Sequence, residues 1–109
     1  MLNFLKNLFK QPYETLSGSE FKARFSQTKG AVLLDVRTPA EFKSGAISGA
    51  KNLDVTSAGF AEKAAKLDKS KTYFLYCRSG ARSGQACSFL SQQGYTVYNL
   101  SGGIGSWPR

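Results

Sequence analysis

From Tyr13 onward, short runs of apolar residues alternate with segments in which apolar residues recur every three or four positions. The runs predict β-strands and the recurring segments predict α-helices, because the two structures repeat their side-chain directions with different periods. The predicted strands cover residues 31–36, 50–53, 73–77 and 96–100, and the predicted helices cover residues 19–27, 39–45, 57–67 and 82–93. This alternation is typical of an α/β domain with a largely parallel sheet.

Two of the predicted helices begin at recognisable capping sequences. Ser17 precedes Glu20 by three residues, which is the spacing of a capping box. Thr38 and Pro39 supply an N-cap followed by proline at the first helical position, with Glu41 as the capping acid. At the other end of the chain, residues 101–107 predict a glycine-rich turn into a final short helix.

The first twelve residues have a pattern of their own. Four apolar side chains fall on one helical face, and Pro12 closes the segment. These side chains are Leu2, Leu5, Leu8 and Phe9. We therefore expect an amphipathic helix over residues 1–12 and one domain over residues 13–109. Docking of this helix on the domain or on a second copy is its favoured role, so a homo-oligomer through residues 1–12 is one expected arrangement. Membrane-surface association and a fusion remnant are less favoured interpretations.

The composition is that of a globular domain. Of the 109 residues, 41% are hydrophobic and only 20% are charged, which argues for a packed core and against disorder. Lys6 and Lys10 interrupt the only apolar stretch that could be mistaken for a membrane span. That stretch also lacks the long apolar region and cleavage site of a secretory signal.

The charge balance favours an anionic partner. Fifteen Lys and Arg residues against seven Asp and Glu residues give a net charge of +8. The cationic residues are scattered along the chain, so a nucleic-acid-binding stripe is not supported and no nucleic-acid partner is expected.

Histidine is absent, which excludes histidine-based catalysis and metal ligation by imidazole. Cys77 and Cys87 are too few for a disulfide scaffold, and they lack the paired short spacings of a zinc site. We therefore expect two free thiols in a reducing compartment, a cytoplasmic location and neither a metal nor a cofactor.

Cys77 is the residue best placed for chemistry, at the carboxyl end of a strand that is apolar and aromatic throughout. Ligands collect beyond such strand ends in open α/β sheets. Residues 77–83 lead from this strand into a helix start, whose backbone N–H groups lack helical partners. Gly80 lets the loop curl, and Arg78 and Arg82 are expected to lower the pKa of the thiol. The loop is predicted to be an anion cradle around a thiolate nucleophile.

The neighbouring residues carry alternative interpretations. Cys77 itself has a structural alternative as a buried core thiol. For Cys87, in mid-helix, core packing is favoured over a disulfide with an oxidised Cys77. Arg82 is expected to face a ligand, because an arginine at a helix N-terminus is otherwise unfavourable. Arg78 has two open orientations, toward solvent and toward substrate. A supporting ion-pair network near a strand end is expected from Asp35, Arg37 and Glu41.

Four segments together resemble the single-domain rhodaneses, a family of sulfurtransferases, over residues 13–109. Residues 34–42 (LDVRTPAEF) are similar to the first signature of the family, and residues 45–50 (GAISGA) to the second. Residues 76–83 (YCRSGARS) resemble the active-site loop, and residues 102–107 (GGIGSW) the C-terminal signature. One position departs from the pattern, because Ala46 stands where the family usually has histidine.

The resemblance implies a five-stranded, mainly parallel sheet flanked by helices on both faces. It also implies that Cys77 takes sulfur from thiosulfate or a related donor, holds it as a persulfide and passes it to cyanide or a thiol. The substrate-binding loop would then consist of Arg78, Ser79, Gly80, Ala81, Arg82 and Ser83.

Two other functions remain open at this point. The first is a non-enzymatic module that receives or relays a persulfide from a partner protein. The second is a cysteine phosphatase, which uses a similar loop but places its arginine six residues after the nucleophile. Here Arg82 follows Cys77 by five residues, so the ring is smaller and suits a sulfur atom better than a phosphate group.

Overall fold

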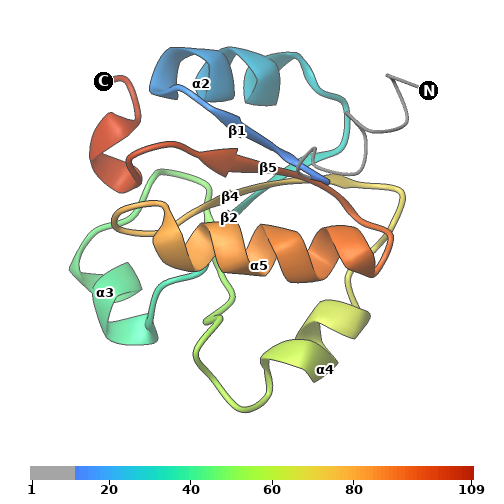
Figure 1. Ribbon diagram of the computed structural model, residues 1–109. Coiled ribbons are helices and arrows are strands. Elements are labelled where there is room, and N and C mark those ends of the chain that lie inside the picture. The colour runs from blue at the N-terminus through green and yellow to red at the C-terminus, as the bar shows by residue number, and fades with distance from the viewer. Residues whose placement is uncertain (1–11) are drawn as a thin grey trace, which may run out of the picture.

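The computed structural model describes residues 12–109, so the helix predicted at the N-terminus lies outside the described residues except for Pro12. Within them, five strands form one sheet in the order β1-β5-β4-β2-β3, and every neighbouring pair is parallel (Figure 1). The α/β class and the five-stranded parallel sheet are thereby confirmed.

The elements follow the predicted order. The strands are β1 (Glu14–Leu16), β2 (Ala31–Asp35), β3 (Lys51–Asn52), β4 (Thr72–Tyr76) and β5 (Thr96–Leu100). The helices are α2 (Gly18–Gln27), α3 (Pro39–Ser44), α4 (Phe60–Ala65) and α5 (Ala81–Gln92), followed by the short 3₁₀ helix η1 (Ile104–Ser106). Both predicted caps are present, since Ser17 and Thr38 accept hydrogen bonds from the backbone N–H groups three residues later.

Two predictions were wrong in detail. The edge strand β1 has only three residues and no apolar run, so the pattern did not indicate it. The helix predicted over residues 57–67 is shorter, because residues 57–60 form a turn, closed by Phe60 N–H bonding to Ser57 O, and α4 begins only at Phe60. At its other end, Leu67 N–H bonds to Ala64 O, three residues back, which closes the last turn.

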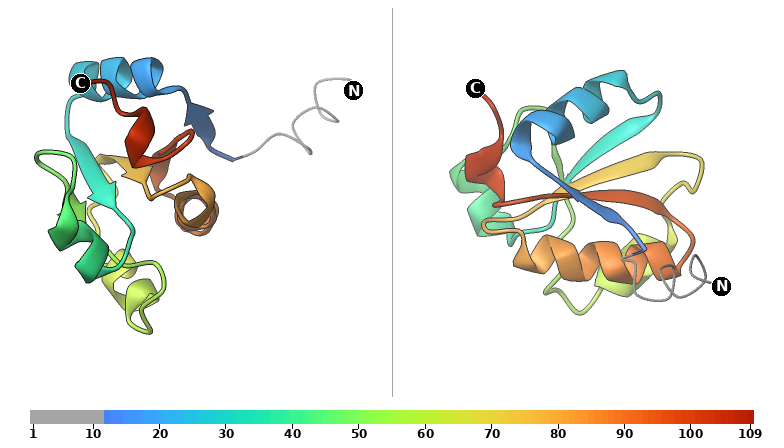
Figure 2. Two further views of the ribbon diagram at one scale, coloured as in Figure 1. Left: turned by 90° about the vertical axis from the view of Figure 1, so that its left-hand side faces the viewer. Right: turned by 45° about the horizontal axis from the view of Figure 1, so that its top comes forward.

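The sheet is covered on both faces, with α2 and the C-terminal turn on one side and α4 and α5 on the other (Figure 2). Successive side chains of β4 point to opposite faces of the sheet and so contribute to two separate cores. Phe74 packs in the cluster that contains Phe21 of α2, whereas Leu75 packs in the cluster that contains Leu90 of α5. No helix within residues 12–109 is long and apolar enough to cross a membrane.

The C-terminal turn braces the segment that follows β4. Trp107 packs edge-to-face on Phe21, with ring centroids 6.1 Å apart. Ile104 N–H donates to the carbonyl of Cys77 at 2.9 Å. Gly103 has a φ of 78°, and a Cβ at this position would overlap the carbonyl group of Arg78. The loop after β4 and the turn carrying η1 are therefore packed backbone against backbone.

We predict that Gly103→Ala lowers the free energy of unfolding by at least about 2 kcal/mol, because alanine brings both a steric overlap and an unfavourable φ. Gly105→Ala is the matched control, since a Cβ there meets nothing within 4 Å. Its effect should stay within about 0.5 kcal/mol. Urea unfolding followed by circular dichroism measures both values, and equal losses would contradict the backbone packing described above.

Candidate active site

Cys77 directly follows β4, and the loop after it turns back so that α5 begins at Ala81. The turn depends on Gly80, the N-cap of α5, which has a φ of 101°. A Cβ on Gly80 would approach the carbonyl oxygen of Leu100 to 3.3 Å. Glycine also has no side chain to accept hydrogen bonds from the first turn of α5. The N–H groups of that turn therefore stay available for another acceptor.

That acceptor is the Cys77 sulfur. Gly80 N–H donates to Sγ at 3.1 Å, and the N–H and hydroxyl groups of Ser83 each lie 3.4 Å from it. Cys77 is 0% exposed, so these protein groups take the place of water around the sulfur. The sulfur thus lies at the carboxyl end of β4, among loop amides that converge on it and can stabilise a negative charge.

The pKa of Cys77 is lower than that of an ordinary thiol. Burial raises it, but the hydrogen bonds from Ser83, Gly80 and Ser79 together outweigh that effect. The flanking arginines were expected to cause this lowering. Hydrogen bonds are its main cause instead, although Arg82, paired with Glu41, still interacts with the charge of Cys77.

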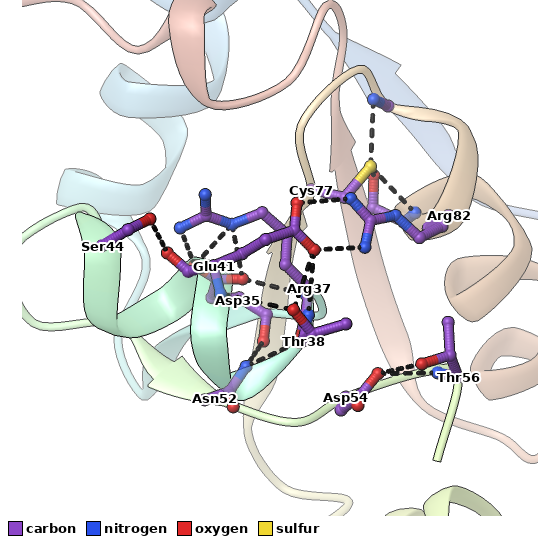
Figure 3. A network of polar contacts seen from close by, with 12 residues as sticks. Asp35, Arg37, Thr38, Glu41, Ser44, Asn52, Asp54, Thr56, Cys77 and Arg82 are labelled. Carbon is purple, nitrogen blue, oxygen red and sulfur yellow. Dashed lines mark hydrogen bonds and ion pairs between the residues drawn. The ribbon is translucent and has the colours of Figure 1, made fainter.

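Arg82 is bound by Glu41 of α3. Its Nη1 lies 2.7 Å from Oε1 and its Nη2 lies 3.0 Å from Oε2 (Figure 3). The same carboxylate accepts from the backbone N–H of Thr38, which completes the capping box of α3. These hydrogen bonds, with that of Arg82 the largest, lower the pKa of Glu41 to about 2. The charge of Arg82 is therefore paired in this structure, and its expected role toward a ligand stays a prediction.

Asp35 and Arg37 form a second, separate pair. Asp35 is 0% exposed and accepts from the backbone N–H of Arg37 at 2.9 Å and from its guanidinium group. Arg37 Nη2 also donates to the carbonyl of Gly45 at 2.6 Å. This guanidinium joins the end of β2 to the segment after α3. The predicted single network of Asp35, Arg37 and Glu41 is thus two pairs, because Glu41 turns to Arg82.

The remaining loop residues face outward. Arg78, Ser79 and Ala81 are exposed, and Ser79 Oγ accepts from the N–H of Ala81 at 3.4 Å. Ala46 is also exposed, at the position where the family usually has histidine. It lines a surface groove of about 630 Å³ together with Ile104 and Trp107.

Cys87 lies on α5, one helical turn beyond Ser83, and is 0% exposed. Burial and the nearby charge of Cys77 raise the pKa of its thiol strongly. Its neighbours in the core include Leu90 and Val97. This environment agrees with the packing role favoured for Cys87.

The sequence analysis missed Asn99 of β5. This residue is 5% exposed, and its Oδ1 lies 2.6 Å from the hydroxyl of Ser83. Its Nδ2 donates to the carbonyl of Gly80 at 3.3 Å and to Thr15 Oγ1 at 3.4 Å. A polar residue near the carboxyl end of an otherwise apolar parallel strand was the signal that could have identified it.

Comparison with known proteins gives a consistent set of relatives. The family model for the rhodanese-like domain matches residues 17–109. A sulfurtransferase of Allochromatium vinosum is 40% identical over 95 residues, covering 86% of this chain and 87% of that protein. The thiosulfate sulfurtransferase GlpE of Stutzerimonas stutzeri is 37% identical, covering 79% of this chain and 78% of that protein. A rhodanese-related protein from Thermoplasma volcanium, of known structure, is 32% identical with a TM-score of 0.76, covering 87% and 90% of the two chains.

We predict that Asp35→Asn lowers the free energy of unfolding by about 3 kcal/mol, because it leaves a buried guanidinium group without its counter-charge. Glu14→Gln is the control. It removes the pair of Glu14 with Arg24, which is 3.4 Å long and 56% and 43% exposed, so the loss should be under about 1 kcal/mol. Urea unfolding at neutral pH measures both. A similar small loss in both variants would show that the Asp35–Arg37 pair does not hold the end of β2.

Proposed function

We propose that this chain, which belongs to the family of rhodanese-like domains, is a sulfurtransferase that carries sulfur on Cys77 as a persulfide. Relatives named as a sulfurtransferase and as a thiosulfate sulfurtransferase support sulfur transfer as the general activity. The observation that carries the finer proposal is the convergence of the N–H groups of Gly80 and Ser83 on one buried sulfur, with the Ser83 hydroxyl within 3.4 Å of it.

In the first step the Cys77 thiolate attacks the outer sulfur of thiosulfate. A new sulfur–sulfur bond forms to Sγ, and the sulfur–sulfur bond of thiosulfate breaks, its electron pair leaving with sulfite. The transferred sulfur remains on Cys77 as a persulfide with one negative charge. Charge is conserved, because thiolate and thiosulfate together carry as many negative charges as persulfide and sulfite.

In the second step a nucleophile such as cyanide attacks the outer sulfur of the persulfide. The bond between the two sulfur atoms breaks, thiocyanate leaves, and the electron pair returns to Sγ as a thiolate. Both steps therefore begin or end with an anionic Sγ, which the loop donors stabilise. A general base is unnecessary once the thiol has ionised.

The burial of Cys77 restricts the donor. Because the residue exposes none of its surface, a donor whose reacting end is a single sulfur atom fits better than a bulky group. The same point disfavours a phosphatase. Its phosphate group would need a wider ring and an arginine free to bind oxygen atoms, whereas Arg82 makes two hydrogen bonds to Glu41.

The remaining assignments belong to this proposal. Arg78 has an exposed side chain and is the loop cation best placed to meet an approaching anion. Arg82 positions the loop through its ion pair with Glu41, and this pairing reduces the positive charge that Arg82 presents to a substrate. Both cysteines are thiols, which suits a reducing compartment, and we therefore propose the cytoplasm as the location.

We predict that Cys77→Ser abolishes transfer of sulfur from thiosulfate to cyanide, whereas Cys87→Ser keeps most of it. Only Cys77 has the loop donors and a lowered pKa. After incubation with thiosulfate and removal of the excess, the intact mass of the wild type should rise by one sulfur atom and fall again with cyanide.

A phosphatase assay on the same sample is the control. Equal losses from the two cysteine replacements would contradict the assignment of Cys77. A sulfur adduct that forms only with a persulfidated protein donor, and never with thiosulfate, would favour the relay module instead.

We predict that Arg82→Ala raises the KM for thiosulfate about tenfold. The substitution removes a positive charge from the loop and leaves the Glu41 carboxylate unpaired, and this carboxylate then repels a dianion. Arg82→Lys should be intermediate, since lysine restores the charge without the two-point contact. Glu41→Gln should change the KM in the opposite direction. Glutamine still suits the capping box but no longer neutralises Arg82, so the KM should fall.

Steady-state kinetics with varied thiosulfate and fixed cyanide measure these constants. Wild-type kinetics in Arg82→Ala would mean that the loop amides suffice and that the pair only joins α3 to α5.

A further inference from the structure

The hydroxyl group of Ser83 lies between two partners. It is 3.4 Å from Cys77 Sγ on one side and 2.6 Å from Asn99 Oδ1 on the other. Ser83 is 0% exposed, so water cannot supply an extra donor to either partner at the hydroxyl. A hydroxyl group has one hydrogen, and it can be directed to only one of the two at a time.

The orientation of the Asn99 amide is set by its surroundings. The carbonyl of Gly80 can only accept, so the nitrogen of the amide must face it, at 3.3 Å. The oxygen of the amide then faces Ser83. Because this oxygen can only accept as well, the contact of 2.6 Å requires the Ser83 hydrogen to point toward Asn99.

Two hydrogen-bond arrangements follow. With Cys77 as a thiol, S–H donates to Ser83 Oγ, and Ser83 O–H donates to Asn99. With Cys77 as a thiolate, the proton has gone to solvent, and the Ser83 hydrogen must rotate to the sulfur. It then leaves Asn99 Oδ1 without a partner, at a cost typical of a buried acceptor.

We propose that Asn99 is a positioning residue that competes with the Cys77 thiolate for the hydrogen of Ser83. It thereby favours every state in which Sγ is not anionic over the state in which it is. In the persulfide, Sγ is bonded to carbon and to sulfur and the negative charge lies on the outer sulfur, so the hydrogen of Ser83 can return to Asn99. Asn99 thus favours the sulfur-loaded form over the empty thiolate.

This inference rests on the proposed function of Cys77 as the sulfur carrier, but its test needs no sulfur transfer. The other ionisable groups near the sulfur include Arg78 next to it, Arg82 with its partner Glu41, Cys87 on α5, Tyr13 packed against the same core, and the Asp35–Arg37 pair at the end of the adjacent β2. They are the same in all the variants below. Differences between variants therefore report on Ser83 and Asn99.

The experiment is a pH titration of the thiolate ultraviolet absorbance of Cys77 in the full chain. A Cys77→Ala titration is subtracted to remove the five tyrosines and Cys87. Asn99→Leu keeps a similar branched shape without the acceptor. It should lower the pKa of Cys77 by up to about one unit, a tenfold rise in the ratio of thiolate to thiol.

The direction of the shift separates competition from structural damage. If Asn99→Leu merely loosened Gly80, the sulfur would lose a donor and the pKa would rise, which would overturn the proposal. In a Ser83→Ala background there is no hydrogen to compete for. There Asn99→Leu should leave the pKa unchanged, and an equal fall in both backgrounds would also overturn the proposal.

Two further variants keep the test decisive if Asn99→Leu does not fold. Asn99→Asp retains an acceptor for the Ser83 hydrogen and adds a negative charge, so the pKa of Cys77 should rise. The rise should be larger in the protein that has Ser83 than in the Ser83→Ala background. A rise that is the same in both backgrounds would indicate only the added charge and would overturn the competition. Thr15→Val is the matched control, because it removes the other partner of Asn99 Nδ2 and should leave the pKa at the wild-type value.

Discussion

A sulfur anion that is closed off from water needs hydrogen-bond donors from the protein, and the structure around Cys77 is organised by that need. Burial alone would raise the pKa of the thiol. The N–H groups of Gly80 and Ser83 reverse this effect because they come from a helix start whose N-cap is a glycine. A serine or aspartate at residue 80 could accept the Ser83 N–H itself and would also be strained at a φ of 101°. The absence of a side-chain cap on α5 is thus a condition for the anion site.

The loop keeps its shape because several distant segments hold it. Glu41 of α3 pairs with Arg82, and the turn that carries Gly103 packs against the backbone of Arg78. Asn99 of β5 binds the carbonyl of Gly80 and the hydroxyl of Ser83. These supports come from three different parts of the chain that meet at the carboxyl edge of the sheet. A parallel sheet brings such segments together, because all of its strands end on the same side.

Local signals explain which parts of this architecture could be predicted from the sequence. The helix starts at Ser17 and Thr38 depend on residues three positions apart, and β4 is a continuous apolar run. The position of Cys77 at a strand end followed from the same reasoning. The partner of Arg82 did not, because Glu41 is 41 residues away and its capping sequence indicated only a local role. Asn99 was missed because its partners lie on two distant segments, the start of α5 and β1. Strand β1 was missed because an edge strand of three residues leaves no periodic pattern.

The charges of this protein divide into two roles that its net charge alone does not reveal. The chain carries a net charge of +8, yet two arginines beside the sheet's carboxyl edge, Arg37 and Arg82, are neutralised by Asp35 and Glu41. Stabilisation of the sulfur therefore depends mainly on the fixed N–H dipoles of Gly80 and Ser83, which salt screens little because they are in contact with the buried sulfur. The unpaired surface charge acts at longer range, where it raises the rate at which anions approach and is weakened by salt. Because the two roles are separate, the proposed anion site at the sulfur rests on buried donors, while exposed charges such as that of Arg78 act on anions that approach it.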